Sequence, residues 1–458
     1  MKFQKTVICL LLALFLLAGC QKAPALEAVE GPAINGISLS SYAIVYSDED
    51  TDYALRAAQY LQTEIENRTG VLLPLQEDSS VTATHEIVVG NTGRQVSADL
   101  DADCARDQFA LLSQGSQVAL EGDYFLIAAA AYYFVETYIT GNDFVAQIPT
   151  TPTLCTPITQ SPSRFILLIG DGMGPNHVKL FDAPPLRLSK LDGFSDVEDI
   201  FYGYLFPHHG FARTDSLSGT TDSAAGGTAL ATGYKTLNYH VGQDRNQQPL
   251  KSLTELANER GMATAVMSTE VPTGATPAAF SAHADNRNDT ADIRASQKLL
   301  EEQGTIIRCD YNYYDSQVAT YVEGAVLETL AQLEQDPDGF CMMYEEAHID
   351  KHSHSNDLNG TFMALVRFNQ VIGTVMEYAF YHPDTFVLIT ADHETGDLHS
   401  GAFHRDSHSG ADVPVFAFGE GSAVFDSVTV ENTQIPKTIA KLWGVADFGD
   451  PYGAPALE

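Results

Sequence analysis

Apolar runs of strand length alternate with segments of helical periodicity along most of this chain. Three of the runs, at residues 165–170, 340–344 and 385–391, are almost unbroken. Continuous apolar runs of this length are typical of strands that are buried on both faces of a parallel sheet. From residue 164 onward, the pattern therefore predicts an α/β sheet with helices on both of its faces.

The first part of the chain shows the same alternation on a smaller scale. Its strand-like runs and helical segments lie at residues 42–46, 52–69, 86–90, 109–112 and around 124–138. No cluster of acids or histidines stands out among them. We therefore expect residues 37–147 to form a small α/β domain that is not catalytic.

A proline-rich stretch follows this domain. Residues 148–163, IPTTPTLCTPITQSPS, hold four prolines among threonines and serines. Proline lacks a backbone donor and has a fixed φ, so such a stretch forms neither a helix nor a central strand. We expect an extended linker here, which makes residues 164–458 a second and larger domain.

The N-terminus has the pattern of a targeting segment. Lys2 and Lys5 precede an apolar run over residues 7–18, which has the length of a signal-peptide core and is too short to span a bilayer. The run ends in the letters LAGC at residues 17–20, which resemble the lipobox of bacterial lipoproteins.

The lipobox resemblance implies that residues 1–19 are a signal peptide, that Cys20 is lipidated after cleavage, and that residues 20–36 are a tether. An ordinary secretory signal with an incidental cysteine is the alternative. We expect an extracytoplasmic protein that is held to the bacterial cell membrane through Cys20, either at the cell surface or in the periplasm.

The composition narrows the range of functions. The 458 residues contain 60 Asp and Glu against 25 Lys and Arg, a formal net charge of −35, and 44% of them are hydrophobic. This apolar content suffices for a folded chain of two or three domains. Because a protein this acidic repels the nucleic-acid backbone, we expect no nucleic-acid binding. An anionic substrate would need cationic side chains or metal ions at the binding site.

Four cysteines lie beyond the N-terminal segment, namely Cys104, Cys155, Cys309 and Cys341. No two of them have the CxxC spacing, and four cysteines in a chain of this size do not make a disulfide framework. The sequence leaves their pairing open.

Candidate chemistry begins directly after the proline-rich stretch. The apolar run at residues 165–170 leads into the letters DGMG, which start at Asp171. A carboxylate at the carboxyl end of a buried parallel strand lies where open α/β sheets place their ligands, and the two glycines allow a close approach of the backbone. An Asp-Gly turn after a strand is common, so this motif is weak on its own.

The strongest motif is TTDSAAGGTA at residues 220–229, followed by TGYKT at residues 232–236. Small residues after Ser223 suit a tightly packed helix whose N-terminal amides face the serine and form an anion site. Asp222 and Ser223 could also simply cap that helix. The length of the motif and its distance from Asp171 make it resemble the nucleophile segment of alkaline phosphatases.

Three further motifs follow in the order that this family has. EEAHIDKHSH at residues 345–354 begins at the end of a predicted strand and places Asp350 and His354 four residues apart, on one face of a helix. The letters DH at residues 392–393 follow another predicted strand. HSGADVPV at residues 408–415 resembles the family's last ligand segment.

The resemblance implies two zinc sites and one magnesium site. The matching ligands are Asp350, His354 and His408 for the first zinc, Asp171, Asp392 and His393 for the second, and Asp171, Thr276 and Glu345 for the magnesium. A site with oxygen ligands alone suits Mg²⁺.

The resemblance also implies that Arg287 binds phosphate and that Asp222 holds it in place, because a guanidinium matches the oxygens of a phosphoryl group. In the hydrophilic stretch at residues 285–289, Arg287 is otherwise a surface charge. The chain departs from the family at Gly274, two positions before Thr276, where an acidic residue or a histidine often stands. The sequence therefore leaves open which side chain, if any, lies beside the magnesium site in place of that residue.

Fourteen residues separate His393 from His408, fewer than the family leads us to expect. This spacing indicates a missing surface insertion and weakens the inference of the family's homodimer. His399 and His404 lie in the same loop, and either could replace His408 as a ligand.

Together, the motifs identify residues 164–458 as an alkaline-phosphatase-like domain. The resemblance implies a three-layer α/β/α sandwich with a mostly parallel central sheet, preceded by the small α/β domain. It also implies a phosphomonoester hydrolase that forms a phosphoseryl intermediate on Ser223 and binds small phosphomonoesters and inorganic phosphate.

Three alternatives differ from this interpretation. A phosphodiesterase or nucleotide pyrophosphatase of the same superfamily commonly has a threonine nucleophile and lacks the arginine and the third metal. A sulfatase needs a C/S-x-P-x-R motif, and none surrounds Ser223. A catalytically inactive, surface-binding lipoprotein would have no reason to keep the complete ligand set.

Overall fold

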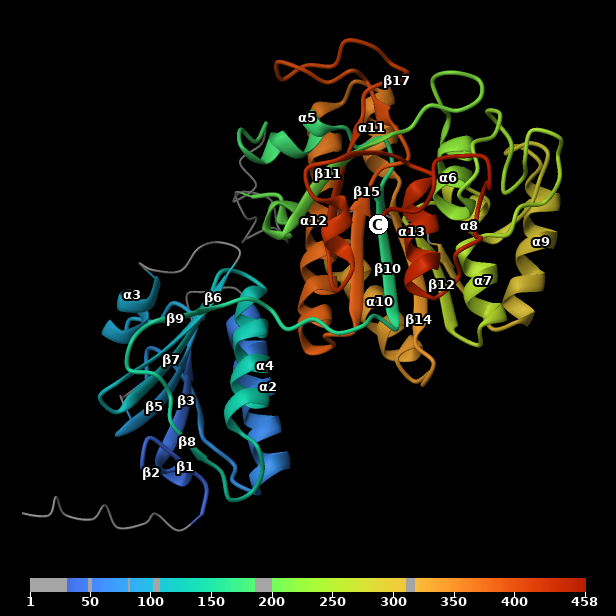
Figure 1. Ribbon diagram of the computed structural model, residues 1–458. Helices are drawn as coiled ribbons and strands as arrows, with labels where there is room; N and C mark the ends of the chain where they lie inside the picture. Colours follow the sequence, from blue (N-terminus) through green and yellow to red (C-terminus); the bar gives the residue numbers. More distant parts are fainter. Residues whose placement is uncertain (1–30, 48–51, 81–82, 102–107, 186–199, 310–317) are drawn as a thin grey trace, which may run out of the picture.

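The computed structural model describes residues 31–47, 52–80, 83–101, 108–185, 200–309 and 318–458. The signal peptide predicted over residues 1–19, the lipidation site Cys20, and Cys104 lie outside the described residues. Figure 1 shows two units, a smaller one built from the first part of the chain and a larger one built from the rest. The cysteines within the described part are free thiols.

The larger unit is built on an eight-stranded sheet with the order β13-β12-β14-β10-β15-β18-β11-β19. The strands are β10 (Arg164–Gly170), β11 (His208–Arg213), β12 (Ala263–Ser268), β13 (Ile306–Cys309), β14 (Phe340–Glu346), β15 (Thr385–Thr390), β18 (Val413–Phe418) and β19 (Thr429–Glu431). β18 is antiparallel to β15 and β11, whereas the other neighbouring strands are parallel. The sheet is therefore mostly parallel, as the unbroken apolar runs predict.

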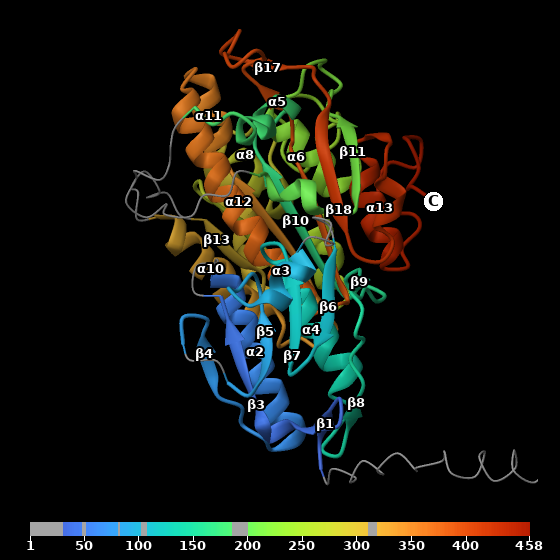
Figure 2. The same ribbon diagram turned by 90° about the vertical axis from the view of Figure 1, so that its left-hand side faces the viewer.

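Helices cover both faces of this sheet and make three layers (Figures 1 and 2). One face carries α10 (Val318–Leu333) and α12 (Leu358–Tyr381), and the other carries α6 (Ser223–Thr232), α7 (Leu253–Glu259), α8 (Ala275–Ser281) and α13 (Gln434–Leu442). The short helices α5 (Pro175–Val178) and α11 (His348–His354) lie at the carboxyl end of β10 and β14, and α9 (Thr290–Glu302) packs on α8. The predicted α/β/α fold class is confirmed.

The smaller unit has a six-stranded sheet with the order β4-β3-β5-β7-β6-β9. Its strands are β3 (Tyr42–Tyr46), β4 (Leu75–Glu77), β5 (His85–Val89), β6 (Phe109–Gln114), β7 (Gln117–Gly122) and β9 (Thr153–Cys155), and its helices are α2 (Asp52–Thr69), α3 (Gln95–Asp101) and α4 (Leu126–Tyr138). A second, small sheet joins β1 (Ala33–Ile34), β2 (Ile37–Ser38) and β8 (Val145–Ala146).

Two segments that the sequence places outside this domain are part of its sheets. Ala33 and Ile34, from the expected tether, form β1 and are buried. Residues 153–155, from the expected linker, pair with β6 as an edge strand. An edge strand tolerates nearby prolines, because only one of its sides must supply hydrogen bonds.

Helix α12 joins the two units. The Nε atom of Arg56 in α2 lies 2.9 Å from both carboxylate oxygens of Glu377 in α12. The ring centroids of Tyr60 and Tyr381 lie 4.3 Å apart, one on each side of the same interface. Apolar side chains continue from one unit into the other without a break. The smaller unit is therefore packed against the larger one.

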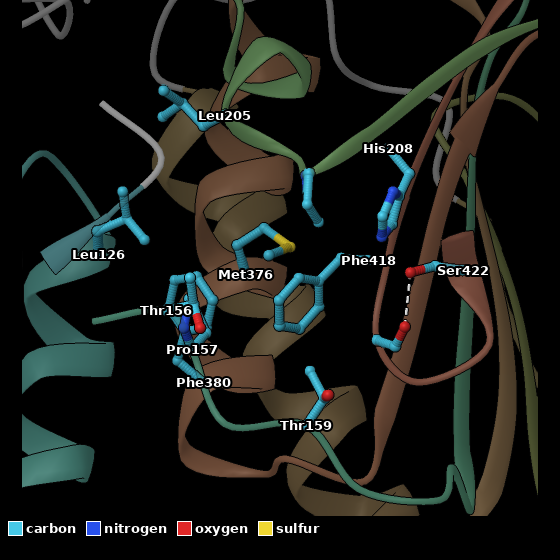
Figure 3. Close-up of a pocket in the computed structure, with 12 residues that line it drawn as sticks. Leu126, Thr156, Pro157, Thr159, Leu205, His208, Met376, Phe380, Phe418 and Ser422 are labelled. Carbon is cyan, nitrogen blue, oxygen red and sulfur yellow. Dashed lines mark hydrogen bonds between the residues drawn. The ribbon is translucent and has the colours of Figure 1, made fainter. Parts of the chain in front are cut away.

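A cavity of about 200 Å³ lies at this interface (Figure 3). Leu126 of α4 lies across it from Met376 and Phe380 of α12, and Phe418 closes another side. The lining is mostly apolar, and none of the site residues predicted from the sequence takes part in it. The cavity therefore belongs to the packing between the units.

Candidate functional site

Three buried acids meet at the carboxyl end of the main sheet. Asp171 directly follows β10, Glu345 is the last residue but one of β14, and Asp392 lies two residues after β15. Strand β10 lies between β14 and β15 and is parallel to both. Because the carboxyl ends of parallel neighbours share one edge, the topology brings together acids that lie up to 221 residues apart in the sequence.

Ser223 reaches this group from the first position of α6. Its Oγ atom lies 3.2 Å from Nε2 of His393. A Cβ atom at Gly226 would lie 2.7 Å from the carbonyl oxygen of Asp392, so the absence of a side chain lets α6 approach the end of β15. The small residues after the serine therefore place its hydroxyl beside the acids.

Asp222 connects the start of α6 to Arg287. Its Oδ1 atom accepts a hydrogen bond from the amide of Ala225 at 3.0 Å, which caps the helix. Its Oδ2 atom lies 3.3 Å from Nη1 of Arg287 and also accepts a hydrogen bond from the amide of Tyr239 at 3.1 Å. The Arg287 side chain is 30% exposed, so its remaining donors are open to an anion.

Two groups of side chains have the composition and spacing of metal sites. Asp171, Asp392 and His393 form one group, and Asp350, His393 and His408 form the other, with the ligand atoms of each group within 4.8 Å of one another. Nε2 of His393 lies 3.2 Å from Oδ2 of Asp392 and 3.5 Å from Oδ1 of Asp171. Burial and the adjacent His408 imidazole hold the pKa of His393 well below its usual range, which keeps the ring neutral, as a metal ligand must be.

His354 belongs to the same cluster. Its Nε2 atom lies 3.1 Å from Nε2 of His408 and 3.3 Å from Oδ1 of Asp350. Its Nδ1 atom lies 2.6 Å from the carbonyl oxygen of Asp406, and Nδ1 of His408 lies 2.8 Å from that of Thr221. A neutral ring that donates from Nδ1 has its lone pair on Nε2, so two lone pairs face each other and a carboxylate. A cation between them fits this arrangement.

The two histidines offered as replacements for His408 lie elsewhere. The rings of His399 and His404 stack on each other with centroids 3.5 Å apart, and Nδ1 of His399 contacts the carbonyl oxygen of Asp397. Neither histidine is part of the two ligand groups. His408 is the histidine of this loop that the fold brings to Asp350.

Several buried oxygens in the site have no hydrogen-bond partner. They are Oδ1 of Asp171, Oδ2 of Asp392, Oε1 of Glu345 and Oγ1 of Thr276. Burial and the Asp350 charge raise the pKa of Asp392 to about 7, and burial and the Glu270 charge raise that of Glu345 to about 8. Unpaired buried oxygens and crowded carboxylates are costly without a cation, so this donor set fits bound metal ions.

Glu270 is a further acid of this cluster that was not among the residues predicted from the sequence. Its Oε1 atom lies 1.7 Å from where a Cβ atom of Gly274 would be, and its Oε2 atom lies 2.8 Å from Nζ of Lys351. A carboxylate therefore occupies the space next to Gly274, the position at which the sequence has no acidic side chain. Glu270 comes two residues after β12, so the strand-end rule that identified Asp171 also points to it.

Comparison with known proteins matches this part of the chain to one family. The family model described as alkaline phosphatase matches residues 163–310 and 314–404, together more than half of the chain. Alkaline phosphatase 4 of Bacillus subtilis is 28% identical over 299 residues, which cover 52% of this chain and 62% of that protein. The streptomycin-6-phosphate phosphatase of Streptomyces griseus is 36% identical over 136 residues, 28% of each chain.

Solved structures show the same fold. The alkaline phosphatase of the Antarctic bacterium TAB5 superposes with a TM-score of 0.54 at 24% identity, over 64% of this chain and 100% of that one. A cold-active alkaline phosphatase from Shewanella sp. gives a TM-score of 0.53 at 23% identity, over 61% and 99% of the two chains. The chain spans about 62% of the length of alkaline phosphatases 4 and 3 of Bacillus subtilis.

Within the described residues, none of the helices has the length and apolar character needed to cross a membrane.

Proposed function

Because this chain belongs to the alkaline phosphatase family, we propose that it is a phosphatase and that it hydrolyses phosphomonoesters through a phosphoseryl intermediate on Ser223. The observation that carries the proposal is the position of the Ser223 hydroxyl. It lies 3.2 Å from His393, which belongs to both ligand groups, and it is next to Asp222, which binds Arg287.

The proposal includes two zinc ions and one magnesium ion. Asp350, His354 and His408 would hold the first zinc, Asp171, Asp392 and His393 the second, and Asp171, Thr276 and Glu345 the magnesium. Mixed imidazole and carboxylate ligands suit zinc, and oxygen ligands suit magnesium. When bound, such ions lower the pKa of a hydroxyl or a water and stabilise a departing oxygen.

The residues of the chain supply the remaining chemistry. In the first step, Ser223 Oγ gives its proton to solvent and forms a bond to phosphorus, while the bond from phosphorus to the alcohol oxygen breaks and that oxygen takes up a proton. In the second step, a water molecule loses a proton and attacks the phosphorus of the phosphoserine, the bond from phosphorus to Oγ breaks, Oγ takes up a proton, and inorganic phosphate is released. Arg287 binds the nonbridging phosphoryl oxygens in both steps, and Asp222 fixes the orientation of its guanidinium.

A comparison of three substrates tests the proposal. Hydrolysis of p-nitrophenyl phosphate, its bis-ester and its sulfate is measured before and after chelation and after return of zinc and magnesium. Metal-dependent preference for the monoester supports the phosphomonoesterase. Preference for the diester would favour the phosphodiesterase alternative, although Ser223, Arg287 and Glu345 argue against it. Absence of turnover with metals bound would favour an inactive binding lipoprotein.

We also propose that the protein is extracytoplasmic and lipid-anchored. The support is the sequence of residues 1–20, with its basic start, short apolar run and final LAGC. Replacement of Cys20 by Ser should move the protein from the membrane fraction to the soluble fraction. A Cys20→Ser variant that stays membrane-bound would contradict the anchor without bearing on the phosphatase activity.

A further inference from the structure

The loop between β12 and α8 carries a carboxylate that the family motifs do not include. Glu270 lies two residues after β12, and its backbone amide donates a hydrogen bond to Oγ of Ser268 at 3.0 Å. The same hydroxyl donates to the Glu345 carboxylate on the neighbouring strand. One serine therefore joins the backbone at Glu270 to a ligand of the proposed magnesium site.

The position of the Glu270 side chain depends on the glycine at 274. A Cβ atom there would lie 1.7 Å from Oε1, 2.2 Å from Cδ and 2.6 Å from Cγ of Glu270. The backbone at Gly274 has φ −57° and ψ 152°, which any amino acid can adopt. The glycine therefore serves to provide space, and Glu270 occupies that space.

The Glu270 carboxylate belongs to a charged network around the buried, unpartnered atoms. Oε1 of Glu345 and Oγ1 of Thr276 are fully buried and have no hydrogen-bond partner. Lys351 is the cation facing this network, and it binds Oε2 of Glu270 at 2.8 Å.

We propose that Glu270 supplies the carboxylate that completes the magnesium site, in the space left by Gly274, with Lys351 holding one of its oxygens. This inference rests on the proposed function, because it concerns the third metal of that site. Magnesium keeps several waters when it binds to proteins, and a carboxylate beside its water shell orients those waters. Glu270 is thus a positioning residue for the ion.

The proposal predicts that positions 270 and 274 are coupled. A carboxylate can enter the space from either position, but two side chains cannot share it. Magnesium binding to the zinc-loaded protein is therefore measured by calorimetric titration with Mg²⁺ alone, in the absence of substrate. The variants are Glu270→Gln, Glu270→Ala, Gly274→Asp and the double variant Glu270→Ala/Gly274→Asp.

Glu270→Gln should weaken Mg²⁺ binding by about 10-fold to 100-fold, the usual effect of losing a partner around a metal site. Gly274→Asp should also weaken it, because the new side chain clashes with Glu270 and prevents either carboxylate from fitting the space. The double variant should bind Mg²⁺ more tightly than Glu270→Ala, because it restores one carboxylate to the space. Wild-type affinity in Glu270→Gln, or a double variant no tighter than Glu270→Ala, would overturn the proposal.

Two controls keep the result specific. Glu259→Gln removes an equal charge from an exposed residue of α7, paired with Lys251, and should leave Mg²⁺ binding unchanged. Thermal unfolding in chelator shows whether each variant is folded. Failure of the metal-loaded wild type to hydrolyse p-nitrophenyl phosphate would contradict the proposed function alone, because Mg²⁺ binding is measured without turnover.

Discussion

The Nε2 atoms of His354 and His408 lie 3.1 Å apart, and the Nδ1 atom of each ring is held against a backbone carbonyl. The two residues are 54 positions apart in the sequence, and one lies on α11 and the other on β17 (His408–Ser409). The carbonyls fix the ring orientations, so both rings present a nitrogen to Asp350 before any ion binds.

This pair predicts the effect of removing one ligand. His354→Gln should lose about one zinc per chain after dialysis, because the site keeps only two of its protein ligands. Metal content is measured by mass spectrometry of the dialysed protein. His399→Gln is the matched control, since that ring stacks on His404 outside the cluster. Equal zinc loss in both variants would contradict the assignment of His354.

The position of Ser223 predicts the effect of deleting its hydroxyl. Ser223→Ala should reduce turnover of p-nitrophenyl phosphate by about 10³-fold or more, because it removes the hydroxyl that lies 3.2 Å from Nε2 of His393 and that attacks phosphorus in the proposed mechanism. Metal content and the unfolding temperature should stay unchanged, since alanine fits the start of a helix. Retention of most of the activity would contradict the assignment of the nucleophile.

Arg287 should affect phosphate binding more than folding. Its contact with Asp222 is partly exposed, so the pair contributes little to stability. Arg287→Ala should raise the inhibition constant of inorganic phosphate by about 10-fold or more, which corresponds to the loss of a charge-assisted hydrogen bond. Arg405→Ala, which removes an exposed arginine paired with Asp397, serves as the control. Unchanged inhibition by phosphate would exclude the proposed role.

The buried acids predict an unusual pH dependence of the metal-free protein. Burial and neighbouring charge raise the pKa values of Asp392 and Glu345 to about 7 and about 8, whereas such groups titrate near about 4 in an unfolded chain. Between these values, the folded protein holds protons that the unfolded chain has released. Its stability should therefore fall as the pH rises from about 6.5 to about 8. Below about 6.5 the unfolded chain protonates His177 and His393, whose pKa values are lowered by burial in the folded protein, and these histidines act in the opposite direction.

The loss of stability is measured by thermal unfolding of the chelator-treated, metal-free protein across this pH range. Addition of zinc and magnesium should remove it, because the ions replace the protons. Asp392→Asn should reduce the slope in the chelated protein, since the residue no longer titrates. An unfolding temperature that rises with pH through this range in the chelated wild type would contradict the account.

The sequence predicted the main sheet and most of the candidate site because both depend on local patterns. Unbroken apolar runs identify β10, β14 and β15, and the acids that follow them share an edge in any parallel arrangement. Glu270 also follows a strand, but its placement depends on the space at Gly274, four residues later, and that contact is a feature of the fold rather than of the local pattern.

The boundaries of the smaller unit could not be predicted from local sequence patterns either. A two-residue strand such as Ala33–Ile34 has no periodicity, and its pairing with β8, more than one hundred residues later, is a tertiary interaction. Residues 153–155 form an edge strand because β6 offers them an unpaired side, which their own composition does not indicate.

The length of α12 determines the distance between the candidate site and the smaller unit. Its 24 residues extend about 36 Å. One end follows α11, which carries Asp350 and His354, and the other end packs on α2 through Tyr381 and Tyr60. The smaller unit also leads back to the proposed anchor at Cys20. The chain thus contains its own spacer, because the length of α12 separates the candidate site at one end of the main sheet from the smaller unit.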